Sequence, residues 1–234
     1  MIKASTVVKE LKKLGSAARA KSSIWYFKTK KGEYGYGDVF FGITVPEQRQ
    51  IAKKYQDISL REIDKLLQNK VHECRLTALL MLVQKYAGGD ETQCSRIVKF
   101  YLSHAKYVNN WDLVDSSAHR ILGEYLLKRN RAVLYKLARS KNLWERRIAV
   151  VANFAFIREG QCSDAFRLAK MLLKDKQDLM QKAVGWVLRE TGKKCPGTTE
   201  RFLKKYATVM PRIMLRYAIE RFSERKRKSY LSRR

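Results

Sequence analysis

The sequence has little proline, no long apolar run and few acidic residues. Three prolines in 234 residues leave room for long, uninterrupted helices. The longest wholly apolar run, Ala78–Val83, is far shorter than the ~20 residues that span a bilayer. The first residues, Met1–Thr6, also lack the apolar stretch of a signal peptide. We therefore expect no membrane association and an intracellular, cytoplasmic location, associated with the nucleoid if the source is bacterial.

Cysteine is scarce and scattered. The four cysteines show no C-x-x-C spacing, which argues against a structural zinc site and against a disulfide scaffold. They are Cys74, Cys94, Cys162 and Cys195. We expect all four to be the reduced thiols of an intracellular protein. Zinc-finger, P-loop and H-E-x-x-H patterns are also missing, so we expect neither a metal nor a cofactor.

Positive charge is what the sequence has in excess. Lysine and arginine number 50 against 22 aspartates and glutamates, a formal net charge of +28. Because 45% of the residues are hydrophobic, the chain can build a core and is not a disordered polycation. Its length suits one domain, expected over residues 1–234 with a basic tail from about residue 223 to residue 234. A folded body this basic favours a polyanionic partner, above all nucleic acid.

Apolar residues recur every three or four positions, as they do in amphipathic helices. Clear examples are Ile51–Tyr55, Ile58–Leu67 and Leu76–Tyr86. No run alternates long enough to require a sheet, so the sequence predicts an all-α fold. Ser59 and Glu62 predict a helix start with a capping box. The glycines of residues 88–90 and Gly192 predict two helix ends.

A weak repeat runs through the chain, in which a cationic residue opens a short apolar helix. Arg75 and Arg147 are 72 positions apart, or two periods of 36, and Lys182 follows Arg147 by 35. The segment Trp111–Leu122 fits the vacant slot. A period of ~35–40 residues with paired helices is typical of a HEAT-like solenoid, although amphipathicity alone can produce such similarity. The repeated cations and helix N-termini would make its concave face suitable for a phosphate backbone.

Two further basic segments are less informative. Residues Lys28–Asp38 contain three glycines and three lysines, which indicates a mobile basic loop. Contact with a nucleic-acid backbone and a plain surface location both fit this loop. The tail Arg221–Arg234 is rich in arginine and lysine, and we expect it to be solvated rather than bound to nucleic acid.

The segment Asn109–Ser116 is unusual because it would place carboxylates on a phosphate-binding face. Trp111 and Asp115 are four residues apart and therefore share one side of a helix. Trp144 and Trp186 lie in later repeats, so stacked repeats would let three indoles approach one carboxylate. Such a group can stabilise the oxocarbenium-like sugar formed when an N-glycosidic bond breaks, and can orient a water molecule. Indole faces add cation–π attraction.

Structural roles compete with this chemistry. Each tryptophan taken singly is more typical of a core, and Asp112 is equally suited to capping a helix. The three histidines are expected to be structural or surface residues. They are His72, His104 and His119.

Three motifs, in order, carry a resemblance to a known family. They are the segments Asn110–Asp115, Leu143–Ala149 and Gln181–Glu190. The stretches Phe27–Pro46 and Met210–Phe222 match as well. Over nearly its whole length the sequence resembles the AlkD-type DNA alkylation repair glycosylases.

The resemblance implies a solenoid of HEAT-like repeats that wraps duplex DNA. It also implies excision of cationic alkylpurines, chiefly N7-methylguanine and N3-methyladenine, without flipping the base. By the same resemblance, Asp115 would be the catalytic carboxylate, and Trp111 and Trp186 would contact the deoxyribose of the lesion. Arg147, or its neighbour Arg146, would hold a phosphate. Weaker expected backbone contacts are Tyr26, Thr44, Arg49, Lys53 and Arg189.

The leading hypothesis is a monofunctional glycosylase that leaves an abasic site. It would act as a monomer on double-stranded DNA containing alkylated bases. The first alternative is a non-catalytic HEAT-like module that binds the DNA backbone or branched DNA. The second is a protein-interaction scaffold, which the charge of +28 argues against unless its partner is very acidic.

Overall fold

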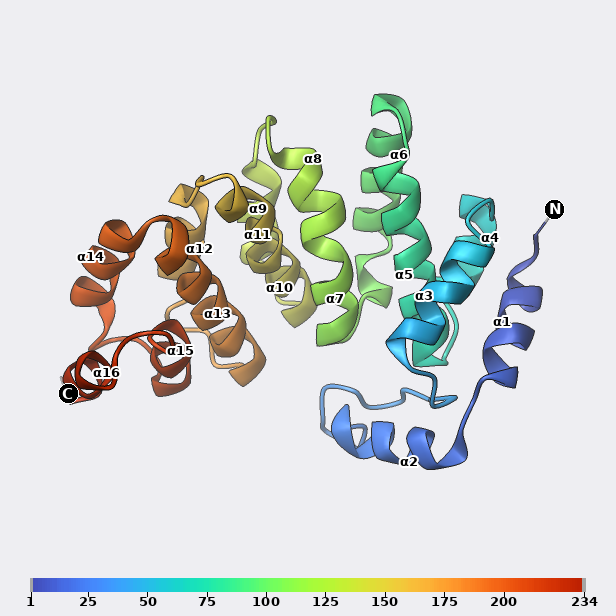
Figure 1. Ribbon diagram of the computed structural model, residues 1–234, viewed down its shortest axis with the longest axis horizontal. Coiled ribbons are helices and arrows are strands. Elements are labelled where there is room, and N and C mark those ends of the chain that lie inside the picture. Colours follow the sequence, from blue (N-terminus) through green and yellow to red (C-terminus); the bar gives the residue numbers. More distant parts are fainter. Residues whose placement is uncertain (1, 233–234) are drawn as a thin grey trace. The chain divides into compact units, whose positions relative to one another are not determined.

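The computed structural model describes residues 2–232, and every element named among them is a helix (Figure 1). The only extended pairing in this part of the chain is an isolated parallel bridge between Val39 and Val71. The prediction of an all-α fold is therefore confirmed. A boundary between Ser117 and Ala118 divides the chain into two compact units, called unit 1 and unit 2 below. The expectation of a single domain stays a prediction.

Unit 1 is built around one apolar helix, α5. Its elements are α1 (Ala4–Lys13), α2 (Ala17–Tyr26), α3 (Val45–Lys54), α4 (Leu60–Leu67), α5 (His72–Ala87), α6 (Glu91–Ser103), the 3-10 turn η1 (Ala105–Tyr107) and α7 (Trp111–Ala118), whose last residue lies past the boundary. Helices α3, α4 and α6 all pack against α5. Because these neighbours surround it, the first eleven residues of α5 are all buried. Helix α2 differs, since none of its residues is buried.

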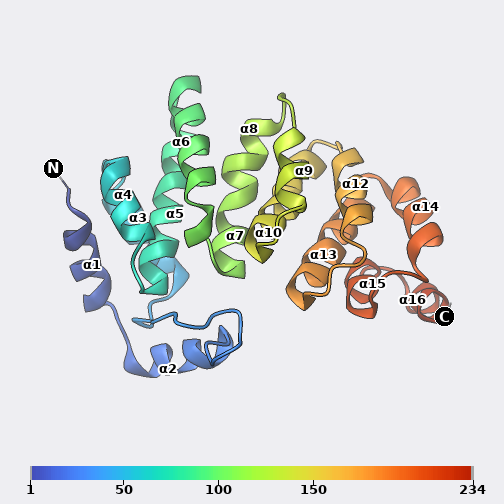
Figure 2. The same cartoon turned by 180° about the vertical axis from the view of Figure 1, so that it is seen from behind.

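Unit 2 is a series of packed helix pairs. Its elements are the π-helical turn η2 (His119–Gly123), α8 (Glu124–Leu126), α9 (Ala132–Ala138), α10 (Leu143–Val151), α11 (Asn153–Arg158), α12 (Ser163–Met171), α13 (Asp178–Lys194), α14 (Pro196–Tyr206), α15 (Arg212–Ala218) and α16 (Glu224–Leu231). Helix α9 packs on α10, and α12 packs on α13. Helix α13 in turn packs between α10 and α15 (Figure 2). Paired helices are what the repeat predicted. The concave face stays a prediction.

A hydrogen-bond pattern before α5, α10 and α13 defines the register of the repeat. The side chains of Asn69, Ser140 and Asp175 each accept a backbone N–H from two residues further on, at 2.8, 3.0 and 2.9 Å. Six residues after each of these, another side chain donates back to its backbone carbonyl oxygen. These donors are Arg75, Arg146 and Gln181, each at 2.9 Å.

The pattern corrects the register expected from the sequence. Arg75 and Arg146 have equivalent partners, so Arg75 corresponds to Arg146 and not to Arg147. The period itself survives, because Gln181 follows Arg146 by 35 residues. Arg146 therefore has a structural role, because its hydrogen bond to Ser140 fixes the turn before α10 to the first turn of that helix.

The predicted helix ends are only partly confirmed. The Ser59 hydroxyl accepts the Glu62 N–H at 3.4 Å, as expected for the start of α4. The Glu62 carboxylate accepts the N–H of Ala4 at 2.8 Å instead of completing a capping box. Gly88 follows α5 as predicted. The expectation for Gly192 is wrong, because α13 continues past it and ends at Lys194, two residues before Pro196 opens α14.

The basic tail is folded onto unit 2 through residue 232. Tyr230 of α16 is buried beside Phe222, with ring centroids 5.8 Å apart. Lys226 contacts Glu200 at 2.9 Å, and Arg212 donates to the Leu231 carbonyl oxygen at 2.6 Å. These contacts anchor the helix, while Arg225, Arg227 and Lys228 are exposed, so the expectation of a solvated tail stays a prediction. Its last two residues lie outside the described part of the chain.

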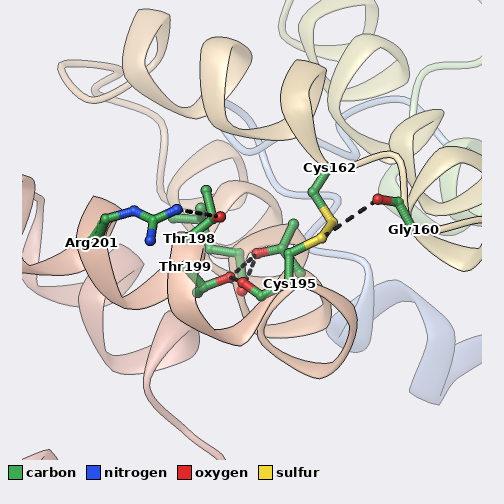
Figure 3. The surroundings of a disulfide bond; sticks show 8 residues. Gly160, Cys162, Cys195, Thr198, Thr199 and Arg201 are labelled. Carbon is green, nitrogen blue, oxygen red and sulfur yellow. Dashed lines mark hydrogen bonds between the residues drawn. A yellow bond between two sulfur atoms is a disulfide. The ribbon is translucent and has the colours of Figure 1, made fainter.

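Two of the four cysteines form a disulfide, which corrects the expectation of reduced thiols. Cys162 precedes α12 and Cys195 follows α13, and their Cα atoms are 6.8 Å apart (Figure 3). Because α12 and α13 pack together, the start of one meets the end of the other. The 33-residue separation contains no short motif that could have indicated this pairing. Cys74 and Cys94 remain thiols.

Reduction of this disulfide should destabilise the protein. A cross-link that closes 33 residues contributes about 3–4 kcal/mol in the chain-entropy model, so reduction should lower the free energy of unfolding by a similar amount. Urea denaturation with and without reductant measures the change. The double variant Cys162→Ser/Cys195→Ser should have the denaturation midpoint of the reduced protein, and reductant should not change it. The midpoint of Cys94→Ser should fall on reduction, as that of the wild type does. Identical oxidised and reduced midpoints would contradict the cross-link.

Candidate functional site

The start of α7 is capped by Asn110, a buried residue. The Asn110 side-chain oxygen accepts the backbone N–H of Trp111 at 2.8 Å. Asp112, which the sequence made equally suited to capping, lies in the first helical turn, and its side chain bonds elsewhere. Asn110 therefore determines where the helix begins and presents Trp111 as its first residue.

Trp111 belongs to an aromatic cluster in unit 1. Its indole stacks on Phe27, with ring centroids 5.5 Å apart and planes 22° apart. Tyr26, the last residue of α2, contacts the same indole edge-on at 5.8 Å. Phe27 also stacks on Phe40 at 5.2 Å and lies 4.7 Å from the His72 ring. The structure thus brings together two predicted site residues, Tyr26 and Trp111, and holds the indole by packing on Phe27.

Asp115 lies one turn after Trp111 on α7 and is half-buried. The helix is held in place by Tyr101 of α6, whose buried hydroxyl lies 3.0 Å from the Ser117 hydroxyl. Burial raises the pKa of Tyr101, and the negative charge of Asp115 raises it further. Tyr101 therefore stays neutral, and Asp115 is an acidic group on a rigid helix, one turn from an indole.

A buried cluster of charges lies beneath the aromatic rings. The His72 side chain is only 2% exposed, and both of its ring nitrogens face carboxylates. Nδ1 lies 3.0 Å from Asp38 Oδ2, and Nε2 lies 2.7 Å from Asp112 Oδ2. Arg75 donates to Asp38 Oδ1 at 2.6 Å, and the Asn110 amide donates to Asp38 Oδ2 at 3.3 Å. The last residue of the predicted basic loop, Asp38, is thus an internal anchor.

The charges in this cluster stabilise one another. Burial opposes protonation of His72, but the Asp112 and Asp38 carboxylates outweigh it and raise the pKa of His72 to about 9. Burial likewise opposes ionisation of Asp38, but the hydrogen bond from His72 and the charge of Arg75 outweigh it and lower the pKa of that carboxyl. At neutral pH His72 is therefore an imidazolium between two carboxylates.

In unit 2, Trp186 is half-buried on α13. Its indole packs on Phe154 of α11, with ring centroids 4.4 Å apart, and Phe154 meets His119 edge-on at 6.3 Å. The neighbouring Gly185 lets α13 approach α15 closely, since a Cβ there would lie 2.5 Å from the Met214 carbonyl oxygen. Trp186 therefore has a firmly packed backbone and a partly accessible ring.

Trp144 is 8% exposed at the start of α10, so it is a core residue of unit 2. This burial favours the core role that competes with a site role for each tryptophan, and the approach of the indoles to Asp115 stays a prediction. The sequence could not separate Trp144 from Trp186, because the burial of each ring depends on the helices that pack against it.

The two candidate phosphate ligands both have internal partners. Arg146 pairs with Asp175 at 2.7 Å in addition to its repeat hydrogen bonds. Arg147 is 5% exposed and donates to the Leu179 carbonyl oxygen at 2.7 Å.

The weaker expected contacts divide into engaged and exposed residues. Arg189 pairs with Glu190 and Glu220. The Thr44 side chain caps α3 and forms a capping box with Glu47. The sequence predicted this type of motif for α4 and not for α3. Arg49 and Lys53 are exposed on α3, and Tyr26 is 56% exposed.

Sequence reasoning missed several exposed apolar residues near the end of α2. Trp25 is 80% exposed, and Ile24 and Tyr36 are exposed as well. In both views α2 stands apart from the helices around α5 (Figures 1 and 2). The nearby Lys28 makes this a basic surface with aromatic groups, a combination typical of nucleic-acid interfaces. The available signal was the aromatic pair next to the lysine-rich loop.

Two features are absent from residues 2–232. No helix there is long and apolar enough to cross a membrane. No three histidine, cysteine, aspartate or glutamate side chains in this range are placed to hold a metal ion.

One family model matches most of the chain, and solved structures share its fold. The family model described as DNA alkylation repair enzyme matches residues 7–222. A predicted DNA alkylation repair enzyme from Enterococcus faecalis has a similar structure, with a TM-score of 0.71, 18% identity and coverage of 90% of this chain and 97% of that one. AlkD2 from Streptococcus mutans gives a TM-score of 0.58 at 19% identity, covering 77% of this chain and 91% of its own. These structures show a shared fold. The search of curated proteins gives no significant match.

Proposed function

The chain belongs to the DNA alkylation repair enzyme family, and from this premise we propose that it is a glycosylase acting on cationic alkylated purines in double-stranded DNA. Its substrates would be chiefly N7-methylguanine and N3-methyladenine. The observation that carries the proposal is the pairing on α7 of Trp111, stacked on Phe27, with the half-buried carboxylate of Asp115 one turn away. A module that only binds a phosphate backbone has no need for an acidic group there.

In the proposed reaction the bond between C1′ of the deoxyribose and the purine nitrogen breaks. The bonding electrons move to the cationic base, which leaves neutral, so no strong general acid is needed. The sugar becomes an oxocarbenium-like cation, which the Asp115 carboxylate stabilises by its negative charge. The oxygen of a water molecule oriented by Asp115 then bonds to C1′, and the proton of that water passes to the carboxylate and on to solvent. The product is an abasic site.

The remaining roles follow the family resemblance. Trp111 and Trp186 would contact the deoxyribose of the lesion and attract its developing charge through their ring faces. The phosphate contact that the resemblance assigns to Arg147 has the least support of these roles, because its side chain is 5% exposed and donates to the Leu179 carbonyl oxygen. Recognition through the sugar would leave the base in the helix, without the base pocket that flipping enzymes use.

The charge of the leaving base gives a sharp test of this proposal. Duplexes carrying N7-methylguanine or N3-methyladenine should release free base, whereas matched duplexes carrying uracil or hypoxanthine should release none. Borohydride should trap no covalent complex, since the enzyme is expected to be monofunctional. Excision of the neutral bases at a similar rate would contradict the electrostatic mechanism.

The charge of +28 also supports DNA binding without catalysis, so binding needs its own prediction. Affinity for duplex DNA should fall roughly 10³-fold or more between 50 and 200 mM salt if six or more phosphates are contacted. Affinity that is independent of salt would instead favour a protein-interaction scaffold.

A pair of neighbouring lysines on α3 provides a matched comparison. Lys53 is exposed, whereas Lys54 is held by Glu10 at 2.8 Å. We expect Lys53→Ala to reduce the salt slope by about one unit, and Lys54→Ala to change it less. Equal changes in the salt slope for the two variants would contradict the assignment of Lys53 to the DNA interface.

A further inference from the structure

The His72 cluster connects three segments that are far apart in the sequence. His72 opens α5, Asp38 ends the basic loop, and Asp112 lies in the first turn of α7, 40 residues from His72. We propose that His72 is a positioning residue, which holds the start of α7 between Asp38 and Asp112 and so orients Trp111 and Asp115. This inference rests on the proposed glycosylase function.

The arrangement of hydrogen bonds suits a charged imidazole. A neutral imidazole has one N–H and can donate to only one carboxylate, which would leave the other nitrogen facing a second acceptor. The imidazolium donates to both Asp38 and Asp112, at 3.0 and 2.7 Å. Arg75 supplies the second positive charge of the cluster, so two cations balance two anions. The carboxylate of the adjacent Glu73 accepts hydrogen bonds from backbone N–H groups, including that of Gly42 at 2.7 Å.

Three consecutive residues at the start of α7 are attached to this cluster. Asn110 donates to Asp38 at 3.3 Å, and Asp112 accepts from His72. Between them, Trp111 stacks on Phe27, which itself lies against the His72 ring. Any rotation of this first turn would move Trp111 and, one turn further on, Asp115.

A merely stabilising role does not explain the choice of residues. Buried ion pairs contribute little more stability than well-packed apolar side chains of the same volume. What charges and directed hydrogen bonds add is a single geometry, since each ring nitrogen has one acceptor at one distance. That property matters where an indole and a carboxylate must be held against a reacting sugar, because a displacement of about 1 Å can cost roughly 100-fold in rate.

The test compares His72→Gln with the wild type and with a matched control. Glutamine keeps one donor but carries no charge. The control is His104→Gln, because His104 of the same unit also pairs with an aspartate, Asp64, at 2.9 Å. The single-turnover rate of base release from an N7-methylguanine duplex is measured at saturating protein, together with duplex affinity and the thermal midpoint.

We expect His72→Gln to slow release by roughly 10- to 100-fold while duplex affinity stays within about threefold. The wild-type rate should also fall as the pH rises through about 9, where His72 loses its proton, and the variant should lack this step. His104→Gln should behave as the wild type. If His72→Gln does not fold, Asp112→Asn, which keeps the shape of the side chain, should show the same loss of rate.

Each other result overturns the inference. A folded His72→Gln that releases base at the wild-type rate would show that His72 is only structural. A loss of rate matched by a loss of affinity would make it a DNA-binding determinant. A wild-type protein that binds the duplex without releasing base would refute the glycosylase function, and this inference with it. Failure of the inference alone differs, because the wild type then releases base and His72→Gln releases it equally fast.

Discussion

Replacing Asp115 with asparagine is expected to slow base release by about 10²- to 10³-fold, the usual cost of removing one preorganised electrostatic group. The amide has nearly the same shape but carries no negative charge to stabilise the oxocarbenium ion. Duplex affinity should be unchanged or slightly higher, because a carboxylate on a DNA-binding face repels phosphates. Single-turnover base release and equilibrium binding, measured on the same N7-methylguanine duplex, separate the two effects.

Asp57→Asn is the control for this substitution. Asp57 is an exposed carboxylate of the same unit, so its loss alters the net charge equally and should leave the rate of release unchanged. A rate for Asp115→Asn equal to that of the wild type would make Asp115 a structural residue of α7. A parallel fall in affinity and rate would place its contribution in binding.

The second large effect concerns stability as a function of pH. The pKa of His72 is raised from 6.5 to about 9, so its contribution to folding is fully present below pH 6.5 and is lost as the pH rises through 9. The stability difference between wild type and His72→Gln should therefore be largest below pH 6.5 and should shrink towards pH 9.

Asp38 acts in the opposite direction. Its pKa is lowered, so its contribution is present above its unfolded value and is lost as the pH falls. Urea denaturation of both proteins from pH 6 to pH 9.5 measures the loss through His72. The contribution of Asp38 is constant over that range, because its pKa lies below 3.8. Wild-type and His72→Gln curves that stay parallel from pH 6 to pH 9.5 would contradict the assignment of a buried imidazolium.

Much of the fold could be predicted from the sequence, because helical periodicity and a repeat of about 35 residues are local signals. The register of that repeat could not. Similar apolar segments align Arg75 equally well with Arg146 or Arg147, and only the hydrogen bonds to the preceding turn decide for Arg146. The disulfide was hidden for a related reason, since its cysteines are 33 residues apart and lie close together only once α12 packs on α13.

The candidate site, too, could be predicted only where its residues lie close together in the sequence. Trp111 and Asp115 are four residues apart, so helical spacing alone places them on one side of α7. The sequence predicts only a structural or surface role for His72, and its partners Asp38 and Asp112 are 34 and 40 positions away. No pattern within one helix could show that its imidazole lies between two carboxylates.

The central claim is that the protein breaks an N-glycosidic bond. The most direct measurement is the release of free N7-methylguanine from a duplex that contains one such base, followed by chromatography with the protein in excess. The account predicts release of one base per duplex, leaving an abasic strand that breaks only on treatment with alkali. Tight, salt-sensitive binding of the same duplex with no free base would contradict it and would assign the protein to DNA binding without catalysis.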